Sequence, residues 1–322
     1  MRLGVLDVGS NTIHLQVMDA HPGARPTPTT NYKVELRLTE YLDISGAISS
    51  GGIQLLNDAI KEAVAHALAN ETDEILAFAT SALREASNGA QIIADINKRY
   101  DIDLQVLNGD DEASMTFLAV RRWLGWSAGK LLVLDIGGGS LEIASGIDEN
   151  PEATISLPLG AARLTREFLN GDPYSAKGIK GLEKHAEEVL KDAMPNSLKT
   201  HDADHFVATS KTFRTLARIC AQWYGDNPKF IERKSLNSAM PRLIEMTSKS
   251  RADLPGVSAN RAQQIGAGGS VALAVMDRLD VDEAEICPWA LREGILLRRL
   301  DWLSDYASGA FIQSIATTSP SR

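Results

Sequence analysis

Hydrophobic positions along the chain predict the same series of elements twice. Segments 3–11 and 131–140 each hold a short apolar run, typical of a buried strand, which ends in Asp, one apolar residue and glycine. Each continues into a stretch that indicates the return strand of a hairpin. Helices are expected to follow in both halves: apolar residues recur at helical spacing over 52–69, and within 261–279 the glycine-rich run 265–270 is followed by an apolar helix. A hairpin followed by helices and strands, present twice, predicts two α/β units with mixed sheets.

These two units define the expected domains. With 322 residues, the chain is most simply two domains of about 150 residues each. The glycine-bounded segment 125–129 marks the boundary, so we expect domain I over 1–125 and domain II over 126–288. Residues 289–303 carry the pattern of an amphipathic helix, and the Ser-, Thr- and Ala-rich segment 304–322 is expected to fray.

The repeated Asp-x-Gly turn carries the first chemical signal. At Asp7 and Asp135 the carboxylate ends a strand, and the glycines that follow let backbone N–H groups approach an anion. Two such turns facing each other across a cleft would hold a phosphate chain from both sides, with two carboxylates available for a divalent cation. One copy alone would more simply be a turn in which Asp bonds its own backbone. The duplication at domain spacing favours a two-domain phosphotransfer fold.

Composition narrows the classes of partner. The formal net charge of −9 and a pI near 5.3 argue against a nucleic-acid-binding surface, so a polyanion must be attracted by local cations and aligned backbone donors. Cys220 and Cys287 provide no disulfide framework and fit a reducing cytoplasm. Strand-like sequence from Arg2 leaves no room for a signal peptide, and no apolar stretch approaches the roughly 20 residues of a membrane helix. We therefore expect a cytoplasmic protein without a nucleic-acid or membrane partner.

Two further carboxylates are candidates for catalysis. Glu112 lies in a run of three acids that opens a helix, where acids are also favoured by helix electrostatics alone. Glu142 follows the second glycine turn on the outgoing strand, although a strand Glu there could equally face solvent. One carboxylate from each unit beside a phosphate-binding crevice suits water activation and metal binding.

Two cations occupy equivalent strand-to-helix turns. Arg84 follows a Thr-Ser pair with which it could bind an oxyanion, or it could form a surface salt bridge with Glu85. Lys211 follows Ser210 in the second unit and could equally be solvated. The six histidines show no metal-ligand spacing, and no Ser-His-Asp or Cys-His set is present.

Five motifs, in this order and at this spacing, resemble one family. They are Asp7-Val8-Gly9-Ser10-Asn11, Ala79-Thr80-Ser81-Ala82-Leu83-Arg84, Gly109-Asp110-Asp111-Glu112-Ala113, Asp135-Ile136-Gly137-Gly138-Gly139-Ser140-Leu141-Glu142 and Ala290-Leu291-Arg292-Glu293-Gly294. Over about residues 1–300 the chain is similar to the exopolyphosphatase / guanosine pentaphosphate phosphohydrolase family, within the superfamily of sugar kinases, heat-shock chaperones and actin. The resemblance implies two ribonuclease-H-like (actin-like ATPase) domains flanking a central cleft, with the last helix, about 289–303, returning to domain I.

The same resemblance implies a reaction and roles for individual residues. The reaction would be hydrolysis of a terminal phosphoanhydride, dependent on Mg²⁺ or Mn²⁺. Glu112 would be the general base that orients water, and Glu142 would be a catalytic partner for metal and water. The metal ligands implied are Asp7, Asp135 and Glu142. The phosphate-binding residues implied are Gly9, Ser10, Asn11, Arg84, Gly137, Gly138, Gly139 and Ser140. Ser210 and Lys211, in the equivalent turn of the second unit, are added as phosphate-binding candidates from the sequence itself.

The chain departs from the family pattern at three points. Ser114 stands where the family has an arginine beside the base, and Lys211 replaces a glycine of the family's Gly-x-Ser-Gly-Thr motif. The chain also stops where longer members continue into an extra helical domain. The added cation favours inorganic polyphosphate as substrate over guanosine pentaphosphate. Hydrolysis of guanosine pentaphosphate and a non-enzymatic actin-like scaffold are the alternatives, and a homodimer stays open.

Overall fold

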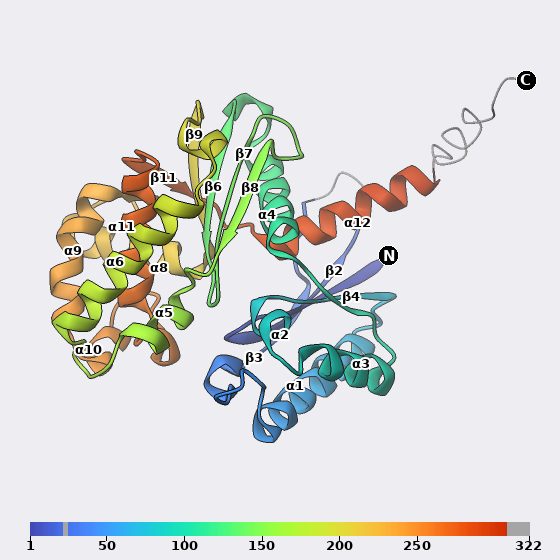
Figure 1. Cartoon of the computed structure of the whole chain (residues 1–322). Coiled ribbons are helices and arrows are strands. Elements are labelled where there is room, and N and C mark those ends of the chain that lie inside the picture. The colour runs from blue at the N-terminus through green and yellow to red at the C-terminus, as the bar shows by residue number, and fades with distance from the viewer. Residues whose placement is uncertain (22–24, 308–322) are drawn as a thin grey trace, which may run out of the picture.

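The computed structural model describes residues 1–21 and 25–307, which form two mixed sheets with flanking helices (Figure 1). The first sheet has the strand order β3-β2-β1-β4-β5. Its strands are β1 (Arg2–Val8), β2 (Thr12–Asp19), β3 (Thr30–Glu35), β4 (Glu74–Ala79) and β5 (Leu104–Val106). Antiparallel pairing joins β1, β2 and β3, whereas β4 runs parallel to both β1 and β5.

The second sheet repeats this order with one addition. Its order is β10-β11-β9-β6-β7-β8. Its strands are β6 (Leu131–Ile136), β7 (Leu141–Gly146), β8 (Ala153–Leu157), β9 (His205–Thr209), β10 (Phe230–Glu232) and β11 (Glu283–Ile286). Strands β6, β7, β8, β9 and β11 hold the places of β1 to β5, and β10 adds an antiparallel edge. The repeated pattern in the sequence therefore corresponds to a repeated sheet, and the predicted α/β fold class is confirmed.

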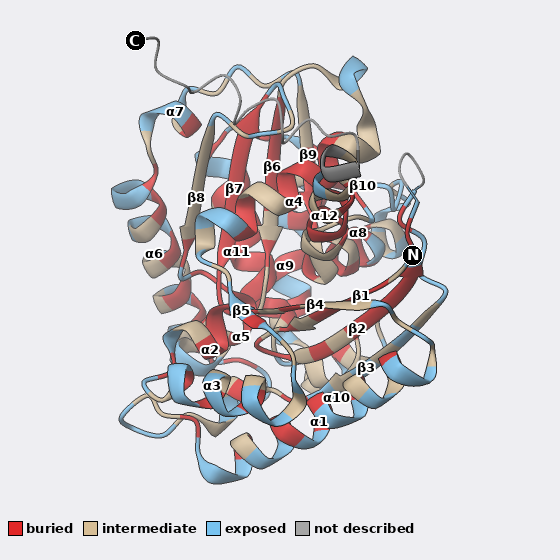
Figure 2. Cartoon of the chain, turned by 90° about the vertical axis from the view of Figure 1, so that its right-hand side faces the viewer, coloured by how far each residue is buried: buried red, intermediate tan, exposed pale blue. Residues whose placement is uncertain are grey.

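Helices cover the outer face of each sheet. On the first sheet they are α1 (Ser50–Ala69), α2 (Ser81–Glu85) and α3 (Gly89–Tyr100). On the second they are α5 (Ala161–Phe168), α6 (Ala176–Ala193), α7 (Asn196–Lys199), α8 (Ser210–Tyr224), α9 (Arg233–Glu245), α10 (Ser248–Ala252) and α11 (Ile265–Arg278). Leu56 and Ile60 of α1 pack with Leu6 and Ile13 of the first sheet, and all four are fully buried. Figure 2 shows burial concentrated in the strands, while the outward faces of α1 and α3 are exposed.

Two helices cover the inner faces of the sheets and pack against each other. These are α4 (Gly109–Leu124) and α12 (Leu291–Ala307). Phe117 of α4 belongs to an apolar cluster with the second sheet, whereas Ile295 of α12 belongs to one with Leu3 of the first sheet. The helices cross at Gly294, where an added Cβ would lie 2.6 Å from the carbonyl carbon of Met115. The last helix thus packs on the N-terminal sheet.

Several element limits differ from those the sequence predicts. The last helix begins at Leu291 and continues to Ala307, so residues 304–307 are helical instead of frayed, and 308–322 lie outside the described residues. The apolar helix expected after the glycine-rich run 265–270 begins at Ile265 itself, so that run is helical. Helix α4 is the last element of the segment expected to be domain I, but it packs on the second sheet. The predicted domain limits themselves stay a prediction. None of the helices described is long and apolar enough to cross a membrane.

Candidate active site

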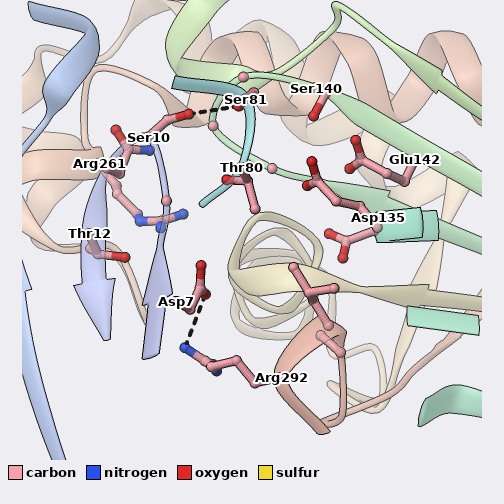
Figure 3. Close-up of a pocket in the computed structure, with 18 residues that line it drawn as sticks. Asp7, Ser10, Thr12, Thr80, Ser81, Asp135, Ser140, Glu142, Arg261 and Arg292 are labelled. Carbon is pink, nitrogen blue, oxygen red and sulfur yellow. Dashed lines mark hydrogen bonds and ion pairs between the residues drawn. The ribbon is translucent and has the colours of Figure 1, made fainter. Parts of the chain in front are cut away.

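A cavity of about 160 Å³ lies between the sheets, where the two glycine turns approach each other (Figure 3). Its lining includes the turn 9–12 from the first half and the turn 137–140 from the second. Of the residues that the sequence predicts for the site, all line this cavity except Arg84, Ser210 and Lys211. The cavity therefore brings together residues that are more than one hundred positions apart in the chain.

The close approach of the turns depends on glycine. A Cβ added to Gly138 would lie 2.8 Å from Asn11 Nδ2, and one added to Gly139 would lie 2.8 Å from Ser81 Cβ. Ser10 and Ser81 share a hydrogen bond of 2.9 Å between their hydroxyls at the same point. Asn11 Nδ2 also donates to Gln264 Oε1 at 3.0 Å, which joins the two halves across the cleft.

Backbone donors of the turns remain available to a ligand. The carbonyl groups of Gly137 and Gly138 accept hydrogen bonds from the first N–H groups of α5, at Ala161 (3.0 Å) and Ala162 (2.9 Å). Within the described chain, the N–H groups of residues 10, 11, 138 and 139 donate no hydrogen bond. Free N–H groups at a glycine turn are a recurrent binding arrangement for anions.

The candidate base, Glu112, lies in the first turn of α4 and is only 7% exposed. Its carboxylate accepts a hydrogen bond from the Arg84 guanidinium, which also donates to the Leu107 carbonyl at 2.7 Å. Burial raises the pKa of Glu112 to about 7, although Arg84 acts in the opposite direction. Arg84, predicted to bind phosphate, is thus an ion-pair partner of the candidate base.

Two carboxylates from the second sheet face the same space. Glu142, 6% exposed, accepts a hydrogen bond of 2.9 Å from the Ser156 hydroxyl. Burial raises the pKa of Glu142 well above its usual range, and the charges of Glu112 and Asp135 add to this shift. Burial also raises the pKa of Asp135 to about 6. Carboxylates whose pKa values rise together in this way have an unmet demand for positive charge.

The fourth carboxylate, Asp7, is paired with a cation from the other end of the chain. Arg292, in the first turn of α12, lies 3.7 Å from Asp7 (Figure 3). Arg292 also donates to His14 Nδ1. Burial raises the pKa of Asp7, and Arg292 opposes that shift. Burial and the neighbouring Arg292 lower the pKa of His14 to about 3, so His14 is neutral at physiological pH.

The carboxylates that line the cavity suit a divalent cation that is bound partly by the protein and partly by the substrate. Among the described residues, no three His, Cys, Asp or Glu side chains are grouped to hold a metal ion. Mg²⁺, however, is usually held by one or two carboxylates together with water and substrate phosphates. Desolvated Asp7, Asp135 and Glu142 beside a row of free N–H donors suit that mode of binding.

Two predicted residues, Ser210 and Lys211, begin α8 and do not line the main cavity. Ser210 begins α8 at a φ of 82°, in the left-handed region that non-glycine residues rarely adopt. Lys211 lines a small neighbouring cavity together with Arg261, which also lines the main cavity. Arg261 and Arg292 are site residues to which the sequence assigns no role. The sequence does contain a signal for Arg292, because this residue belongs to the last of the five motifs.

Comparisons with known proteins agree with one family. Residues 16–302 match the sequence profile of the Ppx/GppA phosphatase family. Exopolyphosphatase 1 of Mycobacterium tuberculosis is 48% identical over 309 residues, which cover 95% of this chain and 90% of that protein. Exopolyphosphatase 1 of Mycobacterium leprae is 47% identical over 309 residues, which cover 95% of this chain and 91% of that protein.

Solved structures show the same architecture. An exopolyphosphatase from Cytophaga hutchinsonii superposes with a TM-score of 0.83 at 26% identity, covering 94% of this chain and 98% of that one. The Ppx/GppA enzyme of Aquifex aeolicus, at 24% identity, has the same fold with a TM-score of 0.75, covering 92% of this chain and 99% of that one.

Proposed function

The chain belongs to the Ppx/GppA phosphatase family, and on that premise we propose that it is an exopolyphosphatase, which hydrolyses the terminal phosphoanhydride of inorganic polyphosphate and releases orthophosphate. One observation carries the proposal. Two glycine turns with free N–H groups face a cavity that also holds four carboxylates, two of them from each half of the chain. This arrangement suits a phosphate chain end that reacts with water.

Glu112 is the proposed general base. A base is most effective when its pKa lies near the working pH, and burial raises the pKa of Glu112 to about 7. The ion pair with Arg84 fixes the position of the Glu112 carboxylate and favours its ionised form. The N–H groups of the two turns would bind the terminal phosphate and stabilise the negative charge that develops on it.

Mg²⁺ is the proposed cofactor, with Mn²⁺ as a substitute. Asp7, Asp135 and Glu142 would hold it together with phosphate oxygens of the substrate. When bound, the ion supplies positive charge to the phosphoryl group that is transferred. Arg292 would orient Asp7, since it lies 3.7 Å from that carboxylate.

The chain is proposed to work in the cytoplasm. Cys220 and Cys287 are free and buried, as expected for a protein that needs no disulfide. Burial raises the pKa of both thiols to about 12, so neither is prepared to act as a nucleophile at neutral pH.

One substrate panel tests the activity. Purified protein with Mg²⁺ is given polyphosphates of defined length, guanosine pentaphosphate or ATP, and orthophosphate is measured. We expect orthophosphate to be released from polyphosphate with a higher kcat/KM than from guanosine pentaphosphate or ATP. A higher kcat/KM for guanosine pentaphosphate than for every polyphosphate would refute the substrate assignment. The absence of release from all of them would favour the scaffold alternative.

A further inference from the structure

A second cavity, of about 190 Å³, adjoins the main cavity at the two glycine turns, and we call it the rear cavity. Ser10, Ser81 and Gly139 line both cavities, so they form the wall between the two. None of the four carboxylates of the candidate active site is among the described residues that line the rear cavity. Figure 3 shows the Ser10–Ser81 hydrogen bond at one end of the main cavity, with Asp7 and Arg292 at the other. The rear cavity therefore lies beyond the glycine turns, as seen from the Asp7 end of the site.

The wall between the cavities is thin and polar. Its side chains are those of Ser10 and Ser81, whose hydroxyls share a hydrogen bond of 2.9 Å, and Gly139 contributes only backbone. From the rear side, Arg163 Nε donates to the Gly139 carbonyl at 2.8 Å. The two serines belong to the first half of the chain and Gly139 to the second, so a small separation of the halves opens the wall. Hydroxyl groups can also turn their hydrogen bonds towards a passing anion.

The rear cavity carries a weak positive charge. Among the described residues that line it, the ionisable side chains are Glu85, Arg163 and Arg166, so two positive charges against one negative leave a net charge of +1. Arg163 is paired with Glu85 across the two halves. Arg166 donates to the Thr39 carbonyl at 3.1 Å and lies 3.6 Å from Glu167. This lining attracts an anion, but most of its hydrogen-bond donors already have partners, so it should hold one only loosely.

The proposed reaction needs a route for its smaller product. Water adds to the terminal phosphorus, the bridging oxygen stays with the shortened chain, and orthophosphate is left at the glycine turns. A long chain that remains bound must then advance by one phosphate, into the place that the orthophosphate still occupies. Because the chain fills the path by which it entered, the orthophosphate has to leave by another opening.

We infer that the rear cavity is the exit for orthophosphate, which passes Ser10, Ser81 and Gly139 while the shortened polyphosphate stays in the main cavity. The inference rests on the proposed function and adds how its smaller product leaves. A cavity needs only roughly 10–15 Å³ to hold one water molecule, so the rear cavity, at about 190 Å³, has room for a hydrated phosphate ion. The neighbouring cavity beside Lys211, at about 10 Å³, does not.

Two variants obstruct the proposed exit in different ways. Leu42→Trp adds bulk at a half-buried residue of the lining, and Arg166→Glu changes the net charge of the lining from +1 to −1. Leu68→Trp and Lys234→Glu are the matched controls, because both residues are exposed on helices, α1 and α9, and neither lines the rear cavity. Arg166 is itself exposed, so the charge variant keeps the test decisive if Leu42→Trp does not fold.

The first measurement compares chain lengths. With long-chain polyphosphate, kcat should fall roughly tenfold in both exit variants without a rise in KM, because product release becomes the slow step. With tripolyphosphate, kcat should change little, since pyrophosphate leaves through the main cavity and orthophosphate can follow it. Acid-quenched samples of the exit variants on the long chain should show a rapid burst of about one orthophosphate per active site before the slow phase.

The second measurement uses inorganic phosphate as an inhibitor of long-chain hydrolysis. In wild type it should lower kcat, because it can return through the rear cavity while a chain is bound, and Arg166→Glu should weaken this effect. Purely competitive inhibition would show that phosphate and chain share one entrance, and the proposed exit would be wrong.

The kinetic outcomes separate the exit from other roles. Equal losses of kcat on short and long substrates, or no loss, would refute the exit while leaving the hydrolase intact. A raised KM for the long chain at unchanged kcat would place the chain itself in the rear cavity and would also refute the exit. Absence of orthophosphate release by wild type from any polyphosphate would instead refute the proposed function.

Discussion

Replacing Gly294 with alanine would test the contact that joins α12 to α4, the helix that carries the proposed base Glu112. Alanine favours an α-helix by about 1 kcal/mol over glycine, so propensity alone predicts a more stable protein. Against this, the new Cβ would lie 2.6 Å from the Met115 carbonyl carbon and closer still to its oxygen, whereas ordinary contacts begin at 3.4 Å. The atoms that must move belong to the backbone of α4, which cannot rotate away.

The helices must therefore separate by roughly 1 Å, and overpacking of this kind costs about 1–3 kcal/mol. Because backbone meets backbone, we take the upper end of that range, which leaves a net destabilisation of about 2 kcal/mol. Arg292 lies two residues before Gly294, so its contact with Asp7 should be displaced and kcat should fall.

Denaturant unfolding and steady-state kinetics measure the two effects. Gly51→Ala is the control, since that glycine is also helical but has no atom within 4 Å of an added Cβ. We expect the control to be as stable as wild type or slightly more stable. A Gly294→Ala protein with wild-type stability and kcat would show that the α4–α12 crossing is not rigid, and the reasoning would be refuted.

Three further predictions concern the carboxylates. Glu112→Gln should lower kcat by roughly 10²–10⁴ with little change in KM if Glu112 activates water, and a near wild-type kcat would leave it only a structural role. EDTA should abolish phosphate release, with recovery on adding Mg²⁺, and full activity in excess chelator would contradict metal dependence. Since the pKa of Glu112 rises from 4.5 in the unfolded chain to about 7 in the folded one, the native state binds the extra proton between these values. Stability should therefore fall, by about 3 kcal/mol from this group, as pH rises from about 4.5 to 7. Denaturant midpoints over this range should show a weaker fall for Glu112→Gln, and an identical fall would show that other groups cause it.

The sequence predicts the repeated parts of this molecule well. Asp7 and Asp135 end equivalent strands, and both glycine turns line the cavity, because an apolar run with a glycine turn is a local signal. Glu112 and Glu142 also line it. Such residues stand at element ends that periodicity can locate from the sequence alone.

Pairings between distant segments could not be predicted in this way. The sequence shows that Arg84 is a cation at a strand-to-helix turn, but not that Glu112 would be its partner. Arg261 and Arg292 enter the site from segments after residue 258, and only the tertiary fold decides which carboxylate or cavity each one meets. The same holds for α4, whose own pattern does not specify which of the two sheets it covers.

The return of α12 to the N-terminal sheet has a consequence for synthesis on the ribosome. Leu3, Val5 and Met18 emerge first, yet the side chains that cover them, Ile295 and Leu296, emerge only with α12. The first half of the chain must therefore wait, with one apolar face uncovered, until α12 has been translated. Arg292 arrives with the same helix, so the nascent chain acquires its finished catalytic cleft only after α12 has emerged, and it can cleave no cellular phosphate polymer before then.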